Sequence, residues 1–131
     1  MVSNTRKVAL VEDDLNLQNM YKLKLEIEGY EVVTAENGRD GLVIIQEFMP
    51  AVVLLDLRMP VMSGDEMLAH MRSKEWGSSI RVIILTNISK SEAPASLRFL
   101  NVDRYIVKAY STPAQVVTVI EEVLGVSNRR A

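Results

Sequence analysis

Four short apolar runs dominate this sequence, and each leads directly into a residue that can take part in phosphate chemistry. The runs and the residues that follow them are 8–11 before Glu12, Asp13 and Asp14; 52–55 before Asp56; 82–85 before Thr86; and 105–107 before Lys108. Apolar runs without polar alternation are typical of parallel strands that are buried on both faces. Because parallel strands end at the same edge of a sheet, these functional groups are expected to converge there.

Segments with a helical spacing of apolar residues alternate with the runs. The predicted helices span residues 15–27, 38–47, 64–74, 92–100 and 113–124, and one further strand spans residues 31–35. The helix over 92–100 contains Pro94, which the first turn of a helix tolerates. Five successive units of strand and helix indicate an open parallel sheet with helices on both sides, which is a doubly wound α/β fold.

The ends of these helices carry recognisable signals. Suitable N-cap residues precede three of them, namely Asn37, Ser91 and Thr112. Residues that suit the left-handed conformation after a helix are Gly29, Asn101 and Gly125. Either Asp13 or Asp14 can cap the helix over 15–27.

Length and composition favour one domain over residues 1–131, with a core over about 5–125 and a short polar tail over 126–131. The net charge of −2 provides no basic excess, which argues against a nucleic-acid surface. The absence of cysteine excludes disulfides and thiolate metal sites and fits a cytoplasmic location. No apolar segment approaches the ~20 residues that cross a bilayer, so membrane insertion is not expected.

The carboxylates at the predicted sheet edge require a cation. Clustered carboxylates cannot all stay ionised at close range without one, so the acidic run at residues 12–14 and Asp56 imply a divalent metal. A carboxylate can also act as the nucleophile in phosphoryl transfer. Asp56 is therefore a candidate phosphoryl acceptor.

Four motifs share their order and spacing with one protein family. They are Val11-Glu12-Asp13-Asp14, Asp56-Leu57-Arg58-Met59-Pro60 followed by Ser63-Gly64, Leu85-Thr86, and Asp103-Arg104-Tyr105-Ile106-Val107-Lys108. In these motifs the chain resembles the receiver domain of two-component response regulators over about residues 5–125. The resemblance implies a flavodoxin-like fold with five parallel strands in the order 2-1-3-4-5.

The resemblance also implies a role for each residue of the site. Asp56 would accept a phosphoryl group from a histidine kinase or a phosphotransfer protein, and Lys108 would pair with Asp56 or its phosphate. Mg²⁺ would be held by Asp13 directly, by Glu12 through water, by Asp56 and by the backbone carbonyl of Arg58. These oxygen ligands suit Mg²⁺, which keeps several of its waters. The chain would then catalyse only its own phosphorylation and dephosphorylation.

Two further residues would carry the change of state that follows phosphorylation. Thr86 would hydrogen-bond the phosphoryl group, and Tyr105 would be the aromatic residue whose rotamer reports the position of Thr86. Such a pair is a two-state element that couples the site to a distant face. Asp14 matches a variable position of the family and is expected to be an ordinary acidic residue at a helix start.

The family's output face corresponds to the helix over 92–100, the strand over 105–107 and the helix over 113–124. A helix on the flank of a sheet needs only one apolar stripe to face the core. In the helix over 113–124, Val117 and Val119 fall outside that stripe. We hypothesise that these two residues and Tyr105 contribute to a homodimer or a downstream partner contact. The alternative is that the helix over 113–124 simply has a wider core stripe.

The chain departs from the family at two positions. Ala109 follows Lys108 where the family usually has a proline in a cis peptide, so we predict a trans bond and a reshaped, longer loop. Asn87 follows Thr86 where the family usually has Ala or Gly. We hypothesise that Asn87 restricts access to the phosphoryl group and slows its hydrolysis.

These departures keep a second interpretation open, in which the chain is a receiver-like interaction module that is not phosphorylated. A phosphatase acting on small molecules is disfavoured because Arg58 stands where such enzymes have a second acid. A flavin or nucleotide binder is disfavoured because the acidic run after the first strand would repel phosphates. No output domain is expected after Leu124, so the chain is either a stand-alone receiver or a domain of a longer protein.

Overall fold

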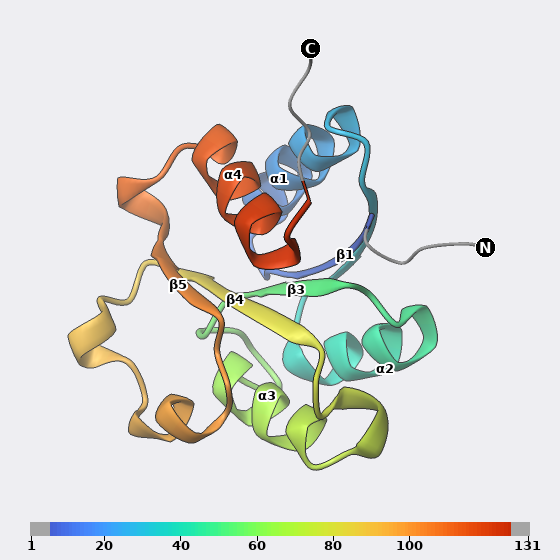
Figure 1. Ribbon diagram of the computed structural model, residues 1–131. Coiled ribbons are helices and arrows are strands. Elements are labelled where there is room, and N and C mark those ends of the chain that lie inside the picture. Colours follow the sequence, from blue (N-terminus) through green and yellow to red (C-terminus); the bar gives the residue numbers. More distant parts are fainter. Residues whose placement is uncertain (1–5, 127–131) are drawn as a thin grey trace.

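The computed structural model describes residues 6–126, so all but the first residue of the predicted tail over 126–131 lies outside these residues. Within the described part, five strands form one parallel sheet (Figure 1). The strands are β1 (Lys7–Val11), β2 (Glu31–Ala35), β3 (Val52–Leu55), β4 (Arg81–Thr86) and β5 (Arg104–Val107). Their order across the sheet is β2-β1-β3-β4-β5, which confirms the predicted topology.

Helices cover both faces of the sheet, as a doubly wound fold requires. They are α1 (Leu15–Ile27), α2 (Gly38–Phe48), α3 (Gly64–Arg72) and α4 (Pro113–Leu124). In Figure 1, α1 and α4 lie on one side of the sheet, and α2 and α3 lie on the other. Alternate residues of β1 enter the two cores: Val8 and Leu10 pack with α1 and α4, whereas Ala9 and Val11 pack with α2 and α3.

The predicted caps are present at three helices. The side chain of Asn37 accepts a hydrogen bond from the Asp40 backbone N–H, and Thr112 forms a capping box with Gln115. Asp14, rather than Asp13, caps α1 by accepting hydrogen bonds from the first-turn amides. Asp13 is therefore left free of a capping role at the carboxyl edge of the sheet.

The prediction of an α-helix over residues 92–100 is wrong. Two short 3₁₀ segments replace it, η2 (Lys90–Glu92) and η3 (Ala95–Phe99), with Ala93 and Pro94 extended between them. A proline disfavours the helical conformation of the residue before it, so Pro94 interrupts a helix that would have to begin two residues earlier. The left-handed conformation predicted for Asn101 is confirmed, with a φ of 54°.

The expectation that α4 carries surplus apolar residues is wrong for Val117. Val117 is buried with Val116 and Ile120 in the core that α4 shares with α1. Val119 is partly buried and also packs against this core. The wider core stripe is therefore the correct interpretation, and these two residues do not form an exposed contact surface.

The loop that follows β5 begins with the trans peptide bond that was predicted. No peptide bond between the described residues is cis, so the bond from Lys108 to Ala109 is trans. Residues Lys108–Tyr110 form a 3₁₀ turn, η4, which leads to the N-cap of α4. Among the helices within residues 6–126, none is long and apolar enough to cross a membrane.

Candidate functional site

Three carboxylates meet at the carboxyl edge of the sheet. Glu12 and Asp13 follow β1, Asp56 follows β3, and one carboxylate oxygen from each residue lies within 4.8 Å of the others. Glu12 and Asp56 are buried, whereas Asp13 is exposed. The convergence of these acids, predicted from the ends of the apolar runs, is therefore observed.

Lys108, at the end of β5, joins two of these carboxylates. Its ammonium donates hydrogen bonds to Glu12 Oε1 and, at 2.9 Å, to Asp56 Oδ2. Only 8% of the Lys108 side chain is exposed, so this ion pair is shielded from water. Trans geometry after Lys108 has thus not turned its side chain away from the site.

The charged groups of the site shift one another's pKa values. Burial opposes the charged form of Lys108, but its hydrogen bonds to Glu12 and Asp56, together with the negative charges of these residues, outweigh burial and raise the pKa of Lys108. Burial raises the pKa of Glu12, the negative charge of Asp56 adds to this, and Lys108 opposes it. Three carboxylates thus face one ammonium within the described residues, which leaves a local excess of negative charge.

Gln18 fixes the position of Glu12, and sequence reasoning missed it. The buried Gln18 amide donates hydrogen bonds to the backbone carbonyls of Glu12, at 2.9 Å, and Ala35, at 3.2 Å. It thereby ties α1 to the ends of β1 and β2. The sequence did contain a signal for this role, because Gln18 is a polar residue at helical spacing from Tyr21 and Leu25, on the buried face of α1.

Asp56 is held by its own loop. Its Oδ1 accepts a hydrogen bond of 2.7 Å from the Leu57 backbone N–H, and its backbone N–H donates to the Val11 carbonyl. The start of α3 presses against this loop at Gly64, where an added Cβ would lie 2.0 Å from the Asp56 carbonyl oxygen. Only glycine can therefore occupy position 64 without moving the backbone of Asp56.

We expect Gly64→Ala to destabilise the fold by about 1–3 kcal/mol, because the overlap is with rigid backbone rather than with a side chain. Gly41→Ala is the matched control, since its nearest atoms are side-chain atoms of Met67 and Val11 that can shift. Urea unfolding measures the loss in the free energy of unfolding for each of the two variants. An equal or larger loss in Gly41→Ala would contradict this account of Gly64.

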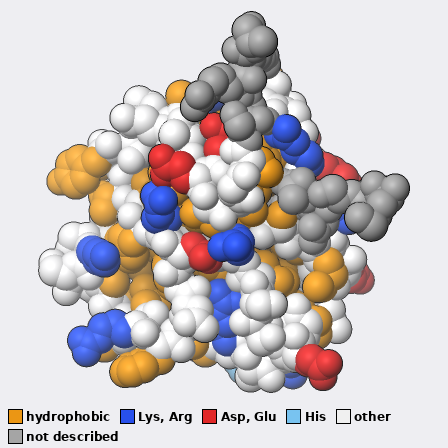
Figure 2. Space-filling model, in the orientation of Figure 1, with side chains coloured by type: hydrophobic (Ala, Val, Ile, Leu, Met, Phe, Trp, Pro, Cys, Tyr) orange, Lys and Arg blue, Asp and Glu red, His pale blue; other side chains and the backbone are white. Residues whose placement is uncertain are grey.

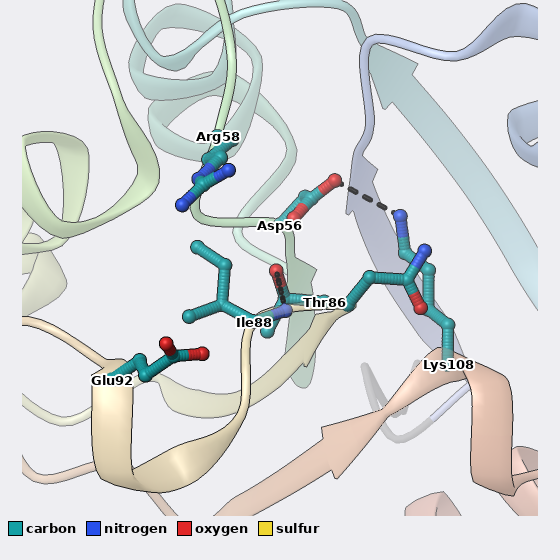
Figure 3. Close-up of a pocket in the computed structure, with 7 residues that line it drawn as sticks. Asp56, Arg58, Thr86, Ile88, Glu92 and Lys108 are labelled. Atoms are coloured by element: carbon teal, nitrogen blue, oxygen red, sulfur yellow. Dashed lines mark hydrogen bonds and ion pairs between the residues drawn. The ribbon is translucent and has the colours of Figure 1, made fainter.

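A pocket opens beside Asp56. Its lining residues are Asp56, Arg58, Thr86, Asn87, Ile88, Glu92 and Lys108. Figure 3 shows Asp56 directed toward Lys108, with Arg58 and Glu92 on the side of the pocket away from Lys108. Thr86 is buried at the end of β4, and its hydroxyl accepts a weak hydrogen bond of 3.4 Å from the Ile88 backbone N–H.

Tyr105 is linked to the segment that follows Thr86. Its hydroxyl donates a hydrogen bond of 2.7 Å to the Ile88 carbonyl and lies 3.4 Å from the Ser89 carbonyl. Burial raises the pKa of the Tyr105 phenol, and the charge of Asp56 adds to this effect. Thr86 and Tyr105 are thus connected through a two-residue stretch of backbone.

Comparisons with known proteins agree with this geometry. The family model described as the response regulator receiver domain matches residues 8–121. The phosphate regulon transcriptional regulatory protein PhoB of Rhizobium meliloti (strain 1021) is 34% identical over 109 residues, which are 82% of this chain and 47% of PhoB. The probable transcriptional regulator ycf27 of Porphyra purpurea is 30% identical over 124 residues, which are 95% of this chain and 49% of that protein.

A solved structure has the same fold. The CheY-like response regulator receiver domain protein from Methanospirillum hungatei JF-1 matches with a TM-score of 0.83 and 28% identity, over 92% of this chain and 94% of that chain. In contrast, the chain spans about half the length of the curated relatives it matches. The similarity therefore covers about half of each of those regulators and not the remainder.

Proposed function

Because this chain belongs to the family of response regulator receiver domains, we propose that Asp56 accepts a phosphoryl group from a phosphohistidine donor. The observation that supports this role best is the buried Asp56 carboxylate between Lys108 and the acidic pair Glu12 and Asp13. The donor would be a histidine kinase or a phosphotransfer protein. In this proposal the chain catalyses only its own phosphorylation and dephosphorylation, at Asp56. The proposed location is the cytoplasm.

The proposed step forms one bond and breaks another. A carboxylate oxygen of Asp56 attacks the phosphorus, and the bond from phosphorus to the donor imidazole nitrogen breaks with its electron pair. The transferring group carries negative charge on its oxygens, which the Lys108 ammonium offsets. The Thr86 hydroxyl lines the same pocket and would donate a hydrogen bond to the phosphoryl group of the acyl phosphate.

The donor set of the site fits Mg²⁺. Glu12, Asp13 and Asp56 supply carboxylate oxygens, which this hard cation prefers, and one ammonium does not balance their charge. We assign the ligands as Glu12, Asp13, Asp56 and the backbone carbonyl of Arg58. When bound, the cation would neutralise charge on the phosphoryl oxygens during transfer.

We expect Mg²⁺ to raise the thermal unfolding temperature of the protein, because a cation that binds only the folded state stabilises it. At one hundred times the dissociation constant, the gain is about 2.7 kcal/mol. Asp13→Asn should lose most of this gain, whereas Asp14→Asn, which keeps a capping side chain on α1, should retain it. Calorimetry at increasing Mg²⁺ concentration measures the gain in unfolding temperature for each variant. Equal gains in the two variants would refute the assignment of Asp13 as a Mg²⁺ ligand.

The switch residues are proposed to act through the backbone between them. Once Thr86 turns toward the phosphoryl group, its contact with the Ile88 N–H is lost, and the Tyr105 hydroxyl bonded to the Ile88 carbonyl senses the movement. The face that changes consists of β5, α4 and the segments η2 and η3. A downstream protein or a second copy of the chain would read this face.

We expect Asn87→Ala to shorten the lifetime of the aspartyl phosphate. Asn87 is exposed and lines the pocket beside Asp56, where its amide can restrict the approach of water to the phosphoryl group. The decay of phosphorylated protein, followed by mass spectrometry after the donor is removed, gives the lifetime. An unchanged or longer lifetime in the variant would show that Asn87 does not protect the acyl phosphate.

Beryllofluoride with Mg²⁺ tests whether the site is a phosphorylation switch, because this complex mimics a phosphoryl group on a carboxylate. We expect it to shift the amide NMR signals of residues 86–89 and 105 in the wild type and to leave Asp56→Ala unchanged. The competing function, an interaction module that is not phosphorylated, predicts no shifts in either protein.

A further inference from the structure

Few polar side chains of this protein are buried, and one of them has no place in the site described above. Figure 2 shows charged side chains spread over one face of the molecule, which is where such groups are normally found. Apart from tyrosines, the buried polar or charged side chains within residues 6–126 are those of Glu12, Gln18, Asp56 and Thr86. Gln18 alone among these belongs neither to the acidic cluster nor to the pocket beside Asp56.

The Gln18 amide anchors the peptide group that joins Glu12 to Asp13. The pairing of β1 with β2 ends at Val11 and Ala35, so the Glu12 carbonyl lies beyond the ladder of the sheet. Gln18 donates one hydrogen bond to this carbonyl, at 2.9 Å, and one to the Ala35 carbonyl, at 3.2 Å. The Glu12 backbone N–H also donates to the Ala35 carbonyl, at 3.0 Å. Both peptide groups of Glu12 are therefore tied to the end of β2, one directly and the other through Gln18.

Asp13 depends on this anchor more than the other two acids of the cluster do. The carboxylates of Glu12 and Asp56 both accept hydrogen bonds from Lys108. The Asp13 side chain is exposed and makes no hydrogen bond or ion pair with any residue in the described part of the chain. Its direction therefore follows from its own backbone, and on the side of Glu12 the Gln18 amide holds that backbone in place.

We propose that Gln18 is a positioning residue for Mg²⁺, which directs the Asp13 carboxylate toward those of Glu12 and Asp56. This inference rests on the proposed function, in which Asp13 is a ligand of the cation. Gln18 is not itself a ligand, because it acts through the single peptide group between Glu12 and Asp13. Residues that orient the ligands of a metal ion contribute about 10–100-fold to its affinity.

The test is Gln18→Met, which keeps an unbranched side chain of similar length but cannot donate to the two carbonyls. Mg²⁺ is titrated into the unphosphorylated protein, and the amide NMR signals of residues 12–14 and 56 give the dissociation constant. We expect this constant to be about 10–100-fold higher in Gln18→Met than in the wild type. In the wild type, the side-chain amide signal of Gln18 should shift with the same dissociation constant as the backbone signal of Asp13.

Phosphorylation by acetyl phosphate provides a second readout, which a merely structural role of Gln18 would not change in the same way. In Gln18→Met, the Mg²⁺ concentration that gives half the maximal rate should rise by about 10–100-fold. The rate at saturating Mg²⁺ should stay within about twofold of the wild-type rate, because the groups that take part in the transfer are intact. Loss of Lys108, in contrast, should lower the rate at every Mg²⁺ concentration.

Two further variants control for a general loss of stability. Leu25→Ala opens a cavity under the last turn of α1, far along the helix from Gln18, and should bind Mg²⁺ as the wild type does. Gln18→Asn keeps the amide but is one methylene shorter, so it cannot reach both carbonyls and should also weaken Mg²⁺ binding. It replaces Gln18→Met if that variant does not fold.

Four results would overturn the proposal. They are an unchanged dissociation constant in a folded Gln18 variant, an equal rise in Leu25→Ala, a rate that stays low at saturating Mg²⁺, and a Gln18 amide signal that ignores Mg²⁺ in the wild type. With Mg²⁺ binding by the wild type and its loss in Asp13→Asn, these results would leave the proposed function intact. A wild type that does not bind Mg²⁺ would instead refute the metal assignment, and this inference with it.

Discussion

Asp56→Asn is expected to abolish phosphorylation of this protein by acetyl phosphate and Mg²⁺. The substitution preserves the size of the side chain and the oxygen that accepts the hydrogen bond from the Leu57 N–H. It removes the carboxylate nucleophile, and a neutral amide does not form the acyl phosphate. Incorporation should therefore fall to the background level, whereas the fold should persist.

The matched control is Asp40→Asn, which changes an exposed acid at the start of α2. This variant should incorporate phosphate at the wild-type rate, as measured by intact-mass spectrometry over time. Residual incorporation in Asp56→Asn equal to that of Asp40→Asn would place the acceptor elsewhere in the chain.

Lys108→Met is expected to have the second largest effect, and it should act on both activity and stability. The Lys108 ammonium contacts the buried carboxylates of Glu12 and Asp56, and removing it leaves both without this partner. Breaking a buried ion pair in this way costs about 3–5 kcal/mol of folding free energy. The rate of phosphorylation should fall by about 10²-fold or more, since a positioned charge that stabilises the transferring group is lost.

A second substitution separates these two effects of Lys108. In the double variant Lys108→Met/Glu12→Gln, one of the unpaired carboxylates is neutralised, so stability in urea should partly return. The phosphorylation rate should stay low, because the double variant still lacks the ammonium. Lys90→Met, at an exposed lysine without an ion pair in residues 6–126, serves as the control and should change neither quantity. A wild-type rate in Lys108→Met would exclude Lys108 from the transfer step.

The fold was predictable because its signals are local and repeated. Uninterrupted apolar runs indicated β1, β3, β4 and β5, and the capping residues Asn37 and Thr112 placed the starts of α2 and α4. The order of the strands could not be derived from such patterns, since pairing is a property of the whole sheet. It came from the resemblance to receiver domains and is observed in the structure.

The acidic cluster was predictable for a different reason. Residues that directly follow parallel strands must meet at one edge, whatever their separation in the sequence, and Glu12, Asp13 and Asp56 do so. Gln18 was not predictable in the same way, because its partners are backbone carbonyls of two strands. Such contacts depend on how closely α1 packs on the sheet.

The two wrong predictions, the helix over 92–100 and the exposure of Val117, have one physical origin. A helical spacing of apolar residues determines neither the backbone restriction that a nearby proline imposes nor which elements pack against the helix. The segment over 92–100 has suitable helix formers, but Pro94 restricts Ala93 to an extended conformation, and this restriction prevailed. Val117 was expected to lie outside the core because one apolar stripe suffices for a flanking helix. In the structure α4 packs against α1 as well as the sheet, so its buried surface is wider.

The location of the phosphoryl group in the wild-type protein is the most direct test of the proposed function. After incubation with acetyl phosphate and Mg²⁺, borohydride reduces an aspartyl phosphate to homoserine, which mass spectrometry of the peptides can locate. We predict homoserine at position 56 and at no other aspartate. Homoserine at a different position, or none in a protein that remains folded, would contradict the assignment of Asp56 as the phosphoryl acceptor.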